Sequence, residues 1–203
     1  VFGVALGVVI LPKLSKSHAN DDTEAFSHAL DWGLRCVLLI GLPASIGLFL
    51  LAEPMISTLF QYQQFGHFDV LMASRSLMAY SLGLMGFILI KILVPGFTSR
   101  KDMKTPVRFG IYAMCANMLL NIIFIIPLAH AGLALATSIG AFFNARLLLK
   151  KLLKDQIYHP GKAWLLFIIR IVIANPTIAF FLFRYCHADL LTYWVLFVWS
   201  SPL

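Results

Sequence analysis

Long apolar runs, separated by short polar segments, dominate this chain of 203 residues. The runs are continuous, whereas a surface helix of a soluble protein has apolar residues at only every third or fourth position. A helix needs roughly 20 apolar residues to cross the hydrocarbon core of a bilayer, and several runs reach that length. We therefore expect an all-α integral membrane protein, a polytopic helical bundle. The predicted spans are about 1–11, 30–52, 70–94, 106–127, 132–149, 163–184 and 190–203.

Polar residues and prolines mark where these helices are expected to begin and end. Asp22 or Thr23 is predicted to cap the second helix, because such side chains accept hydrogen bonds from the first backbone N–H groups. Asp69 is predicted to cap the third helix, and Pro95 with Gly96 to end it. The first and last runs are shorter than a full span, so we expect the chain to be a fragment of a larger protein.

The distribution of charge predicts a topology. The chain is 60% hydrophobic and 12% charged, with a net charge of +7. The basic residues flank the apolar runs, which favours a topology signal over a nucleic-acid surface, and 11 of the 16 flank three alternate loops. Cytoplasmic loops of membrane proteins are enriched in Lys and Arg. Loops 12–32, 98–106 and 150–162 are thus predicted to be cytoplasmic, and loops 53–69, 128–131 and 185–189 to face outside.

The sequence shows no enzyme motif. It has no HExxH, no Gly-rich phosphate loop and no GxSxG. The nearest acid–base cluster, His18 with Asp21 and Asp22, lies in a polar loop, and we interpret it as a solvated helix start. The three cysteines are isolated and lack the spacing of a metal site. We therefore expect no enzyme, no cofactor and no firm metal site.

One face of the predicted span 70–94 is a candidate substrate cavity. Polar side chains are costly in lipid, so they usually face protein or water. Ser74, Ser81 and Lys91 share this face, and Lys91 is able to attract an anionic group. The alternative is that Lys91 extends to the cytoplasmic headgroups. Arg75, near the outer interface, is a further candidate with the same alternative.

Polar residues in the next two spans form a candidate cation site. Asn117 and Asn121 are four residues apart and share a helix face, and so do Thr137 and Asn144 on the following helix. The predicted turn between the two spans is short, so the helices are expected to be antiparallel neighbours. Amide and hydroxyl oxygens suit a hard cation. The alternative interpretation is that these side chains hydrogen-bond between helices.

Arg35 lies near the cytoplasmic start of the second span, four residues after Asp31. We interpret it as a residue that extends toward the headgroups. An exposed pair at this spacing is worth only about 0.3–0.5 kcal/mol.

Three stretches of the sequence are similar to one transporter family. The first is GVALG running into LPKLS at 3–15, with DWGLR at 31–35, and the second is LFQY followed by FD at 59–69. The third, PGFTSRKDMKTP at 95–106, is similar to a loop of the form FYxxxDxxTP, with Thr98 in place of Tyr. Together they resemble the MurJ/MviN family of lipid II flippases. The matching loop residues are Pro95, Gly96, Phe97, Asp102, Thr105 and Pro106.

The resemblance covers about residues 1–185 and implies a fold. The family has the MATE-like fold of the MOP superfamily, with fourteen helices. Residues 1–203 would then form a partial C-terminal lobe, from the end of helix 8 through the start of helix 14. The family's essential cavity arginines lie outside this chain.

The resemblance also implies a function. The family moves lipid II, the undecaprenyl-pyrophosphate-linked disaccharide-pentapeptide, across the bacterial inner membrane by alternating access, for cell-wall biosynthesis. The implied partners are lipid II and membrane lipids, and the full-length protein is expected to be monomeric. The lipid tail is expected in a groove that helices 13 and 14 line.

The resemblance suggests two ways to drive transport. Some relatives bind sodium through a polar i,i+4 pair on helix 11 and a Thr on helix 12. Asn117, Asn121 and Thr137 fall on matching positions, and Asn121 stands where that pattern has an acidic residue. The other drive is the membrane potential, worth about 2.3 kcal/mol per charge per 100 mV.

Three alternative functions remain open at this point. One is another MOP exporter, for polysaccharide lipids or drugs. A second is a membrane-embedded transferase for polyprenyl lipids, which would need a paired His/Asp or two-carboxylate site that the sequence does not show. A third is a nonfunctional truncated product.

Overall fold

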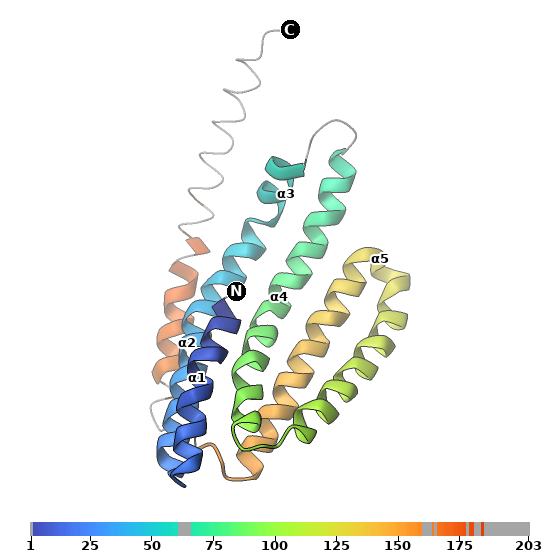
Figure 1. The fold of residues 1–203 in the computed structure, drawn as a ribbon. Coiled ribbons are helices and arrows are strands. Elements are labelled where there is room, and N and C mark those ends of the chain that lie inside the picture. Colours follow the sequence, from blue (N-terminus) through green and yellow to red (C-terminus); the bar gives the residue numbers. More distant parts are fainter. Residues whose placement is uncertain are drawn as a thin grey trace.

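The computed structural model describes residues 2–60, 66–159, 164, 166–177, 179–180 and 184. The regular structure of these residues is helical throughout. The main elements are α1 (Phe2–Ala19), α2 (Thr23–Leu50), α3 (Ala52–Phe60), α4 (His67–Thr98) and α5 (Lys104–Lys154). A further apolar helix, Leu166–Thr177, follows them. The fold is a bundle of long helices, with the short α3 at one end (Figure 1).

Four helices are long and apolar enough to cross a membrane. They are Thr23–Leu50, His67–Thr98, Lys104–Ile126 and His130–Lys154. The predicted class, an all-α polytopic membrane bundle, is therefore confirmed for the described residues. The predicted span at 163–184 is described only in part, and the one at 190–203 lies outside the described residues.

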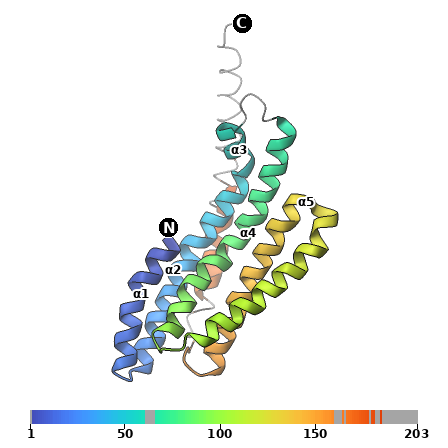
Figure 2. The same ribbon diagram turned by 45° about the vertical axis from the view of Figure 1, so that its right-hand side comes forward.

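The helix α5 turns back on itself, so its two arms, Lys104–Ile126 and His130–Lys154, lie antiparallel and side by side (Figures 1 and 2). Glycines permit the close approach of the arms. A Cβ atom at Gly132 would overlap the carbonyl of Phe124, and one at Gly140 would lie 3.3 Å from the Cβ of Asn117. The antiparallel hairpin agrees with the expectation from the short turn.

The helix α4 packs against the second arm of α5 on one side and against α1 and α2 on the other (Figure 2). Small residues bring α4 and α5 together. A Cβ at Gly83 would lie 2.7 Å from the Cα of Ser138, and one at Gly86 would lie 3.1 Å from the carbonyl carbon of Ala141. The Ser138 hydroxyl lies 2.6 Å from the carbonyl oxygen of Ala79 on α4. Such close packing is typical of helices in a bilayer, where lipid is as apolar as the helix surface.

The contact between α1 and α4 covers a backbone carbonyl of α4 that has no hydrogen-bond donor within its own helix. Pro95 has no N–H, so the carbonyl of Lys91, four residues earlier, lacks its usual intrahelical donor. Gly7 of α1 packs at this point, since a Cβ there would lie 2.7 Å from the Lys91 oxygen. The freed carbonyl is thereby covered by the backbone of α1.

The prediction that Pro95 and Gly96 end the third span helix was wrong. The helix α4 continues to Thr98. Phe97 is buried in the core with only 2% of its surface exposed. This burial stabilises the last helical turn, although Pro95 cannot donate a backbone hydrogen bond. A proline inside a helix is tolerated when neighbouring helices cover the freed group.

The predicted caps are partly correct. Asp22 caps α2, and its Oδ1 accepts a hydrogen bond from the Ala25 amide at 2.8 Å. Asp69 is not the cap of α4, because Gly66 occupies that position. Asp69 lies one turn inside the helix, and its Oδ2 accepts a hydrogen bond from the Gly66 amide at 3.0 Å.

The three loops that were predicted to be cytoplasmic gather at one end of the bundle (Figure 1). The bounds predicted for the first loop, 12–32, were wrong, because α1 continues through Pro12 to Ala19 and α2 begins at Thr23, which leaves only the α1–α2 turn. The other two are the α4–α5 turn and the segment after α5. The opposite end holds α3, the start of α4 and the reversal of α5 (Figure 1). The arrangement agrees with the prediction that successive loops alternate between the two ends of the bundle. The membrane face that each end occupies stays a prediction.

Candidate functional site

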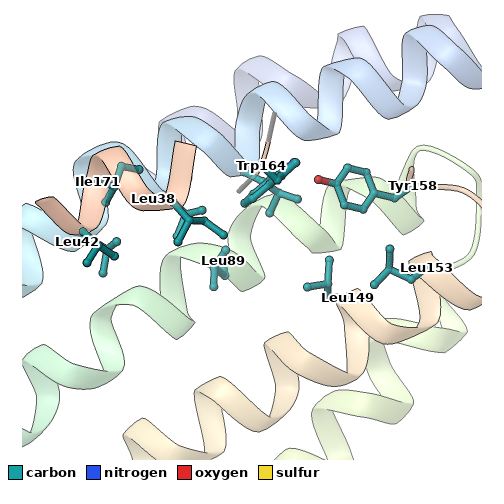
Figure 3. Close-up of a pocket in the computed structure, with 11 residues that line it drawn as sticks. Leu38, Leu42, Leu89, Leu149, Leu153, Tyr158, Trp164 and Ile171 are labelled. Atoms are coloured by element: carbon teal, nitrogen blue, oxygen red, sulfur yellow. The ribbon is translucent and has the colours of Figure 1, made fainter. Parts of the chain in front are cut away.

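An apolar pocket of about 480 Å³ lies between α2, α4, the second arm of α5 and the helix Leu166–Thr177 (Figure 3). Its volume lies within the range of ligand pockets, roughly 300–1,000 Å³. Leucines and isoleucines supply most of its wall, and Leu42, Leu89 and Ile171 are examples. Two wall residues, Ile168 and Val172, are exposed on the bundle surface. The pocket is therefore open to the surface of the part of the chain that the structure describes.

A polar cluster lies at the end of the pocket nearest the basic loops. The Tyr158 hydroxyl donates a hydrogen bond to Asp31 Oδ1 at 2.7 Å. The indole N–H of Trp164 donates to the same oxygen. Both rings also line the pocket (Figure 3). Burial and the neighbouring Asp31 carboxylate raise the pKa of Tyr158 above its ordinary value, so the phenol stays protonated and remains a donor.

Arg35 completes this cluster. Its Nε lies 2.7 Å from Asp31 Oδ2, at an angle that makes an ion pair but no hydrogen bond. The guanidinium carbon lies 5.8 Å from the ring centroid of Trp164 and 5.5 Å from that of Phe167. Such cation–π contacts are worth about 0.5–2 kcal/mol. We refer to Asp31, Arg35, Tyr158 and Trp164 as the Asp31 cluster.

The expectation that Arg35 extends to the headgroups stays a prediction, and the structure shows contacts of this side chain within the protein. Only 32% of its side chain is exposed, and the carboxylate of Asp31 and two aromatic rings hold it. Tyr158 and Trp164 were not among the residues predicted to form a site. An aromatic pair near the start of a span is a weak sequence signal for an interface anchor, but it does not identify the partner on α2.

A second attachment lies one helical turn before Asp31. The Ser27 hydroxyl accepts a hydrogen bond from the His159 amide at 3.0 Å, and it lies 3.4 Å from the His159 carbonyl oxygen. Ser27, Asp31 and Arg35 recur at every fourth residue, so one stripe of α2 holds the segment that follows α5.

The structure does not gather the four substrate-cavity candidates at one place. Ser74 and Ser81 are buried, and their hydroxyls donate to carbonyls of their own helix, at 3.0 Å and 2.7 Å. Lys91 and Arg75 are exposed on the surface of the bundle. The role of these residues in a cavity stays a prediction, and any cavity that includes Lys91 requires a wall from outside the described residues.

The candidate cation site is a set of buried oxygens on the α5 hairpin. The Oδ1 atoms of Asn117, Asn121 and Asn144 are buried and have no hydrogen-bond partner among the described residues. The Thr137 hydroxyl donates to the Leu133 carbonyl at 2.8 Å, which leaves its lone pairs free to accept. A buried oxygen without a donor costs about 1–3 kcal/mol, so a bound cation or water fits this arrangement.

The ligands of such a cation would be neutral. Within the described part of the chain, no group of three or more His, Cys, Asp or Glu side chains is placed to hold a metal ion. Neutral amide, hydroxyl and carbonyl oxygens suit a hard ion of low charge, whereas a transition metal prefers imidazole or thiolate.

The loop motif at 95–106 builds the turn between α4 and α5. The Phe97 carbonyl accepts hydrogen bonds from the amides of Arg100 and Asp102, at 3.0 Å and 3.2 Å. Asp102 Oδ1 accepts a hydrogen bond from the Thr105 amide at 3.1 Å. The Thr105 hydroxyl and nearby amides lower the pKa of Asp102 below its ordinary value. Pro106 follows in the first turn of α5, so the geometry assigns these residues to the connection itself.

A family model described as Lipid II flippase MurJ matches residues 1–199. The chain belongs to the MurJ family. The resemblance found in the sequence is thereby confirmed, and with four membrane-crossing helices the chain is part of a multi-pass membrane protein.

Relatives in the MurJ family are similar over most of this chain. The probable lipid II flippase MurJ of Vibrio cholerae is 47% identical over 86% of the chain, and the lipid II flippase MurJ of Burkholderia cenocepacia is 43% identical over 88%. A solved structure, described as lipid II flippase MurJ in an inward closed conformation, matches 94% of the chain with a TM-score of 0.69 and 25% identity.

The chain spans about a third of the length of these two relatives, 33% and 35%, and 44% of the solved structure. None of these similarities favours the exporter of polysaccharide lipids or drugs, or the polyprenyl transferase, because each matched protein carries the description lipid II flippase.

Proposed function

We propose that this chain is part of a lipid II flippase of the bacterial inner membrane. The observation that carries the proposal is the MurJ family match over residues 1–199, together with 47% identity to a relative described as a probable lipid II flippase. The protein would act as a transporter and catalyse no covalent change. Its substrate would be the undecaprenyl-pyrophosphate-linked peptidoglycan precursor, and the whole protein would act as a monomer.

The apolar pocket supports a role in holding the polyprenyl tail. Its wall offers aliphatic side chains, and its open side would face lipid chains in the whole protein. A polyprenyl chain buries only apolar surface, so such a wall suits it at about 25 cal/mol per Å² of area removed from contact with water. The tail would stay in this apolar environment while the polar headgroup crosses through a cavity formed with other parts of the protein.

The headgroup requires cationic and hydrogen-bonding groups. Lys91 is exposed on α4, two turns from the end that holds the basic loops. We assign it to the pyrophosphate side of the cavity. Alternating access would expose this side first to the cytoplasm and then to the outside.

A cation at the α5 hairpin would couple transport to an ion gradient. The orphaned oxygens of Asn117, Asn121 and Asn144 support this proposal. When bound, sodium would supply the positive charge that satisfies these oxygens and would hold the two arms together. The membrane potential is the alternative drive, because it acts on any net charge that moves with the headgroup.

Complementation tests the proposed function. The complete open reading frame that encodes the chain would be expressed in a bacterium depleted of its own lipid II flippase. We expect growth to be restored, and Lys91→Ala to reduce it more than Lys101→Ala, a change of a similarly exposed lysine in the α4–α5 turn. Normal membrane expression without any growth would refute the proposal.

A further inference from the structure

The stripe of α2 that holds the Asp31 cluster continues directly into the wall of the pocket. Ser27, Asp31 and Arg35 are followed at helical spacing by Leu38 and Leu42, both of which line the pocket. On the other side, Trp164 is followed by Ile168 and Ile171, at the same spacing. The two segments therefore run in the same direction, with the polar contacts at one end and the apolar wall beyond them (Figure 3).

The apolar part of this contact has no directional bond. Leucine and isoleucine side chains attract one another without fixing a distance or an angle. In the described parts of the two segments, the directional contacts are the Asp31 cluster and the bonds between Ser27 and His159. The position of the helix Leu166–Thr177 over the pocket thus depends on the polar end.

Asp31 is the centre of this polar end. Its Oδ1 accepts two hydrogen bonds, from Tyr158 and Trp164, and its Oδ2 faces Arg35. Only 14% of its side chain is exposed. Hydrogen bonds to a carboxylate are about twice as strong as bonds between neutral groups, and low exposure limits their screening. Both donors are themselves pocket-lining residues, so a single carboxylate fixes two side chains of the wall.

We propose that Asp31 is a positioning residue that sets the width of the apolar pocket and thereby selects for a long polyprenyl chain. The inference rests on the proposed function, in which the pocket receives the tail of the substrate. Asp31 acts through Tyr158 and Trp164 and does not touch the tail. A long chain would contact the wall as far as Leu42 and Ile171, whereas a short chain would contact only the end formed by Tyr158 and Trp164. Release of the helix Leu166–Thr177 would therefore remove more contacts from the long chain than from the short one.

Competition binding with two probes tests this selectivity. The protein in lipid nanodiscs would be titrated with undecaprenyl phosphate and, separately, with geranyl phosphate. For Asp31→Ala we expect the preference for the long chain to fall about tenfold, the change that corresponds to 1.4 kcal/mol, because the affinity for the long chain falls more than the affinity for the short chain. Asp31→Asn keeps an acceptor oxygen for Tyr158 and Trp164, so it should retain most of the preference. Glu24→Ala, the loss of an exposed acid on the same helix, is the matched control.

A loss of affinity for both probes by the same factor would contradict the inference, since a general loss of structure has that effect. An unchanged preference in Asp31→Ala would contradict it as well. Binding of neither probe to the unchanged protein would refute the proposed tail site instead, and a distance measurement then decides the role of Asp31. Spin labels at Leu39→Cys and Ile173→Cys, in a background without other cysteines, report the separation of α2 from the helix Leu166–Thr177. Both positions are exposed.

We expect Asp31→Ala to broaden the distance distribution between these labels and to shift it to longer values, with helical content preserved in circular dichroism. Asp31→Asn should restore the narrow distribution. A distribution that is the same in Asp31→Ala and in the unchanged protein would overturn the positioning role.

Discussion

Buried polar side chains in this bundle mostly bond to carbonyl oxygens of their own helix. The hydroxyls of Ser74, Ser81 and Ser99 each donate to a carbonyl three residues earlier. This local bond satisfies a hydroxyl without help from another helix. An asparagine Oδ1 accepts but does not donate, so the oxygens of Asn117 and Asn121 cannot be satisfied in this way. The difference explains why the asparagines are the stronger ligand candidates.

Sodium should therefore stabilise the protein through these oxygens. A ligand that binds only the folded state adds about 2.7 kcal/mol when its concentration is 100 times its Kd. We expect a higher melting temperature in sodium chloride than in choline chloride, and we expect Asn121→Leu to abolish the difference. Asn175→Leu, on the helix Leu166–Thr177, serves as the control and should keep it. Equal melting temperatures in the two salts for the unchanged protein would argue against the cation site.

Asp102 should make stability depend on pH. Its pKa is lowered in the folded protein by hydrogen bonds from Thr105, whereas an unfolded Asp titrates near about 3.9. The contribution is thus fully present above that value and is lost as the pH falls through the lower folded pKa. We expect Asp102→Ala to cost about 0.5–2 kcal/mol at neutral pH, as loss of a helix-capping group does, and the cost to shrink in acid. The free energies of unfolding of the variant and of the unchanged protein, measured at neutral and at acidic pH, give the cost at each pH. A cost that is the same at both would contradict this role of Asp102.

Between elements, small residues determine how closely α4 can approach its neighbours. Gly83 faces Ser138 of the second α5 arm, and Gly7 of α1 faces the Lys91 carbonyl that Pro95 leaves without a donor. The predicted spans 30–52, 70–94, 106–127 and 132–149 overlap the four membrane-length helices of the described residues, because the length of an apolar run is a local property. It failed at the end of α4, because the turn beyond Pro95 is held by Gly7 and by the burial of Phe97. Neither contact is visible in local sequence.

Gly83→Ala should destabilise the packing of α4 against α5. The added methyl would lie 2.7 Å from the Cα of Ser138, a backbone atom that cannot move aside easily. Overpacking of this kind costs about 1–3 kcal/mol. Gly110→Ala, on the first α5 arm, is the matched control, because no heavy atom lies within 4 Å of its Cβ position. It should be neutral or stabilising by up to about 1 kcal/mol. Equal stabilities of the two variants in detergent unfolding would contradict this account of the packing.

At the scale of the whole molecule, the Asp31 cluster could not be predicted from the sequence. Asp31 and Arg35 were visible as an i,i+4 pair of little energetic value. Their partners Tyr158 and Trp164 are 127 and 133 residues away from Asp31 along the chain, and only the folded bundle brings them together. The candidate cation site, which stays a prediction, could be proposed from the sequence, because both of its helices are adjacent in sequence and their polar residues repeat at helical spacing. The DWGLR segment that contributed to the family resemblance thus acquires a physical role from the structure.

The central claim is that this chain belongs to a protein that carries lipid II across the membrane. The most direct measurement quantifies lipid II on the outer face of the inner membrane, in a bacterium depleted of its own flippase that expresses the complete open reading frame. We expect outward-facing lipid II to return to the level of undepleted cells. If lipid II stays on the cytoplasmic side while the protein is present in the membrane at normal levels, the account is contradicted.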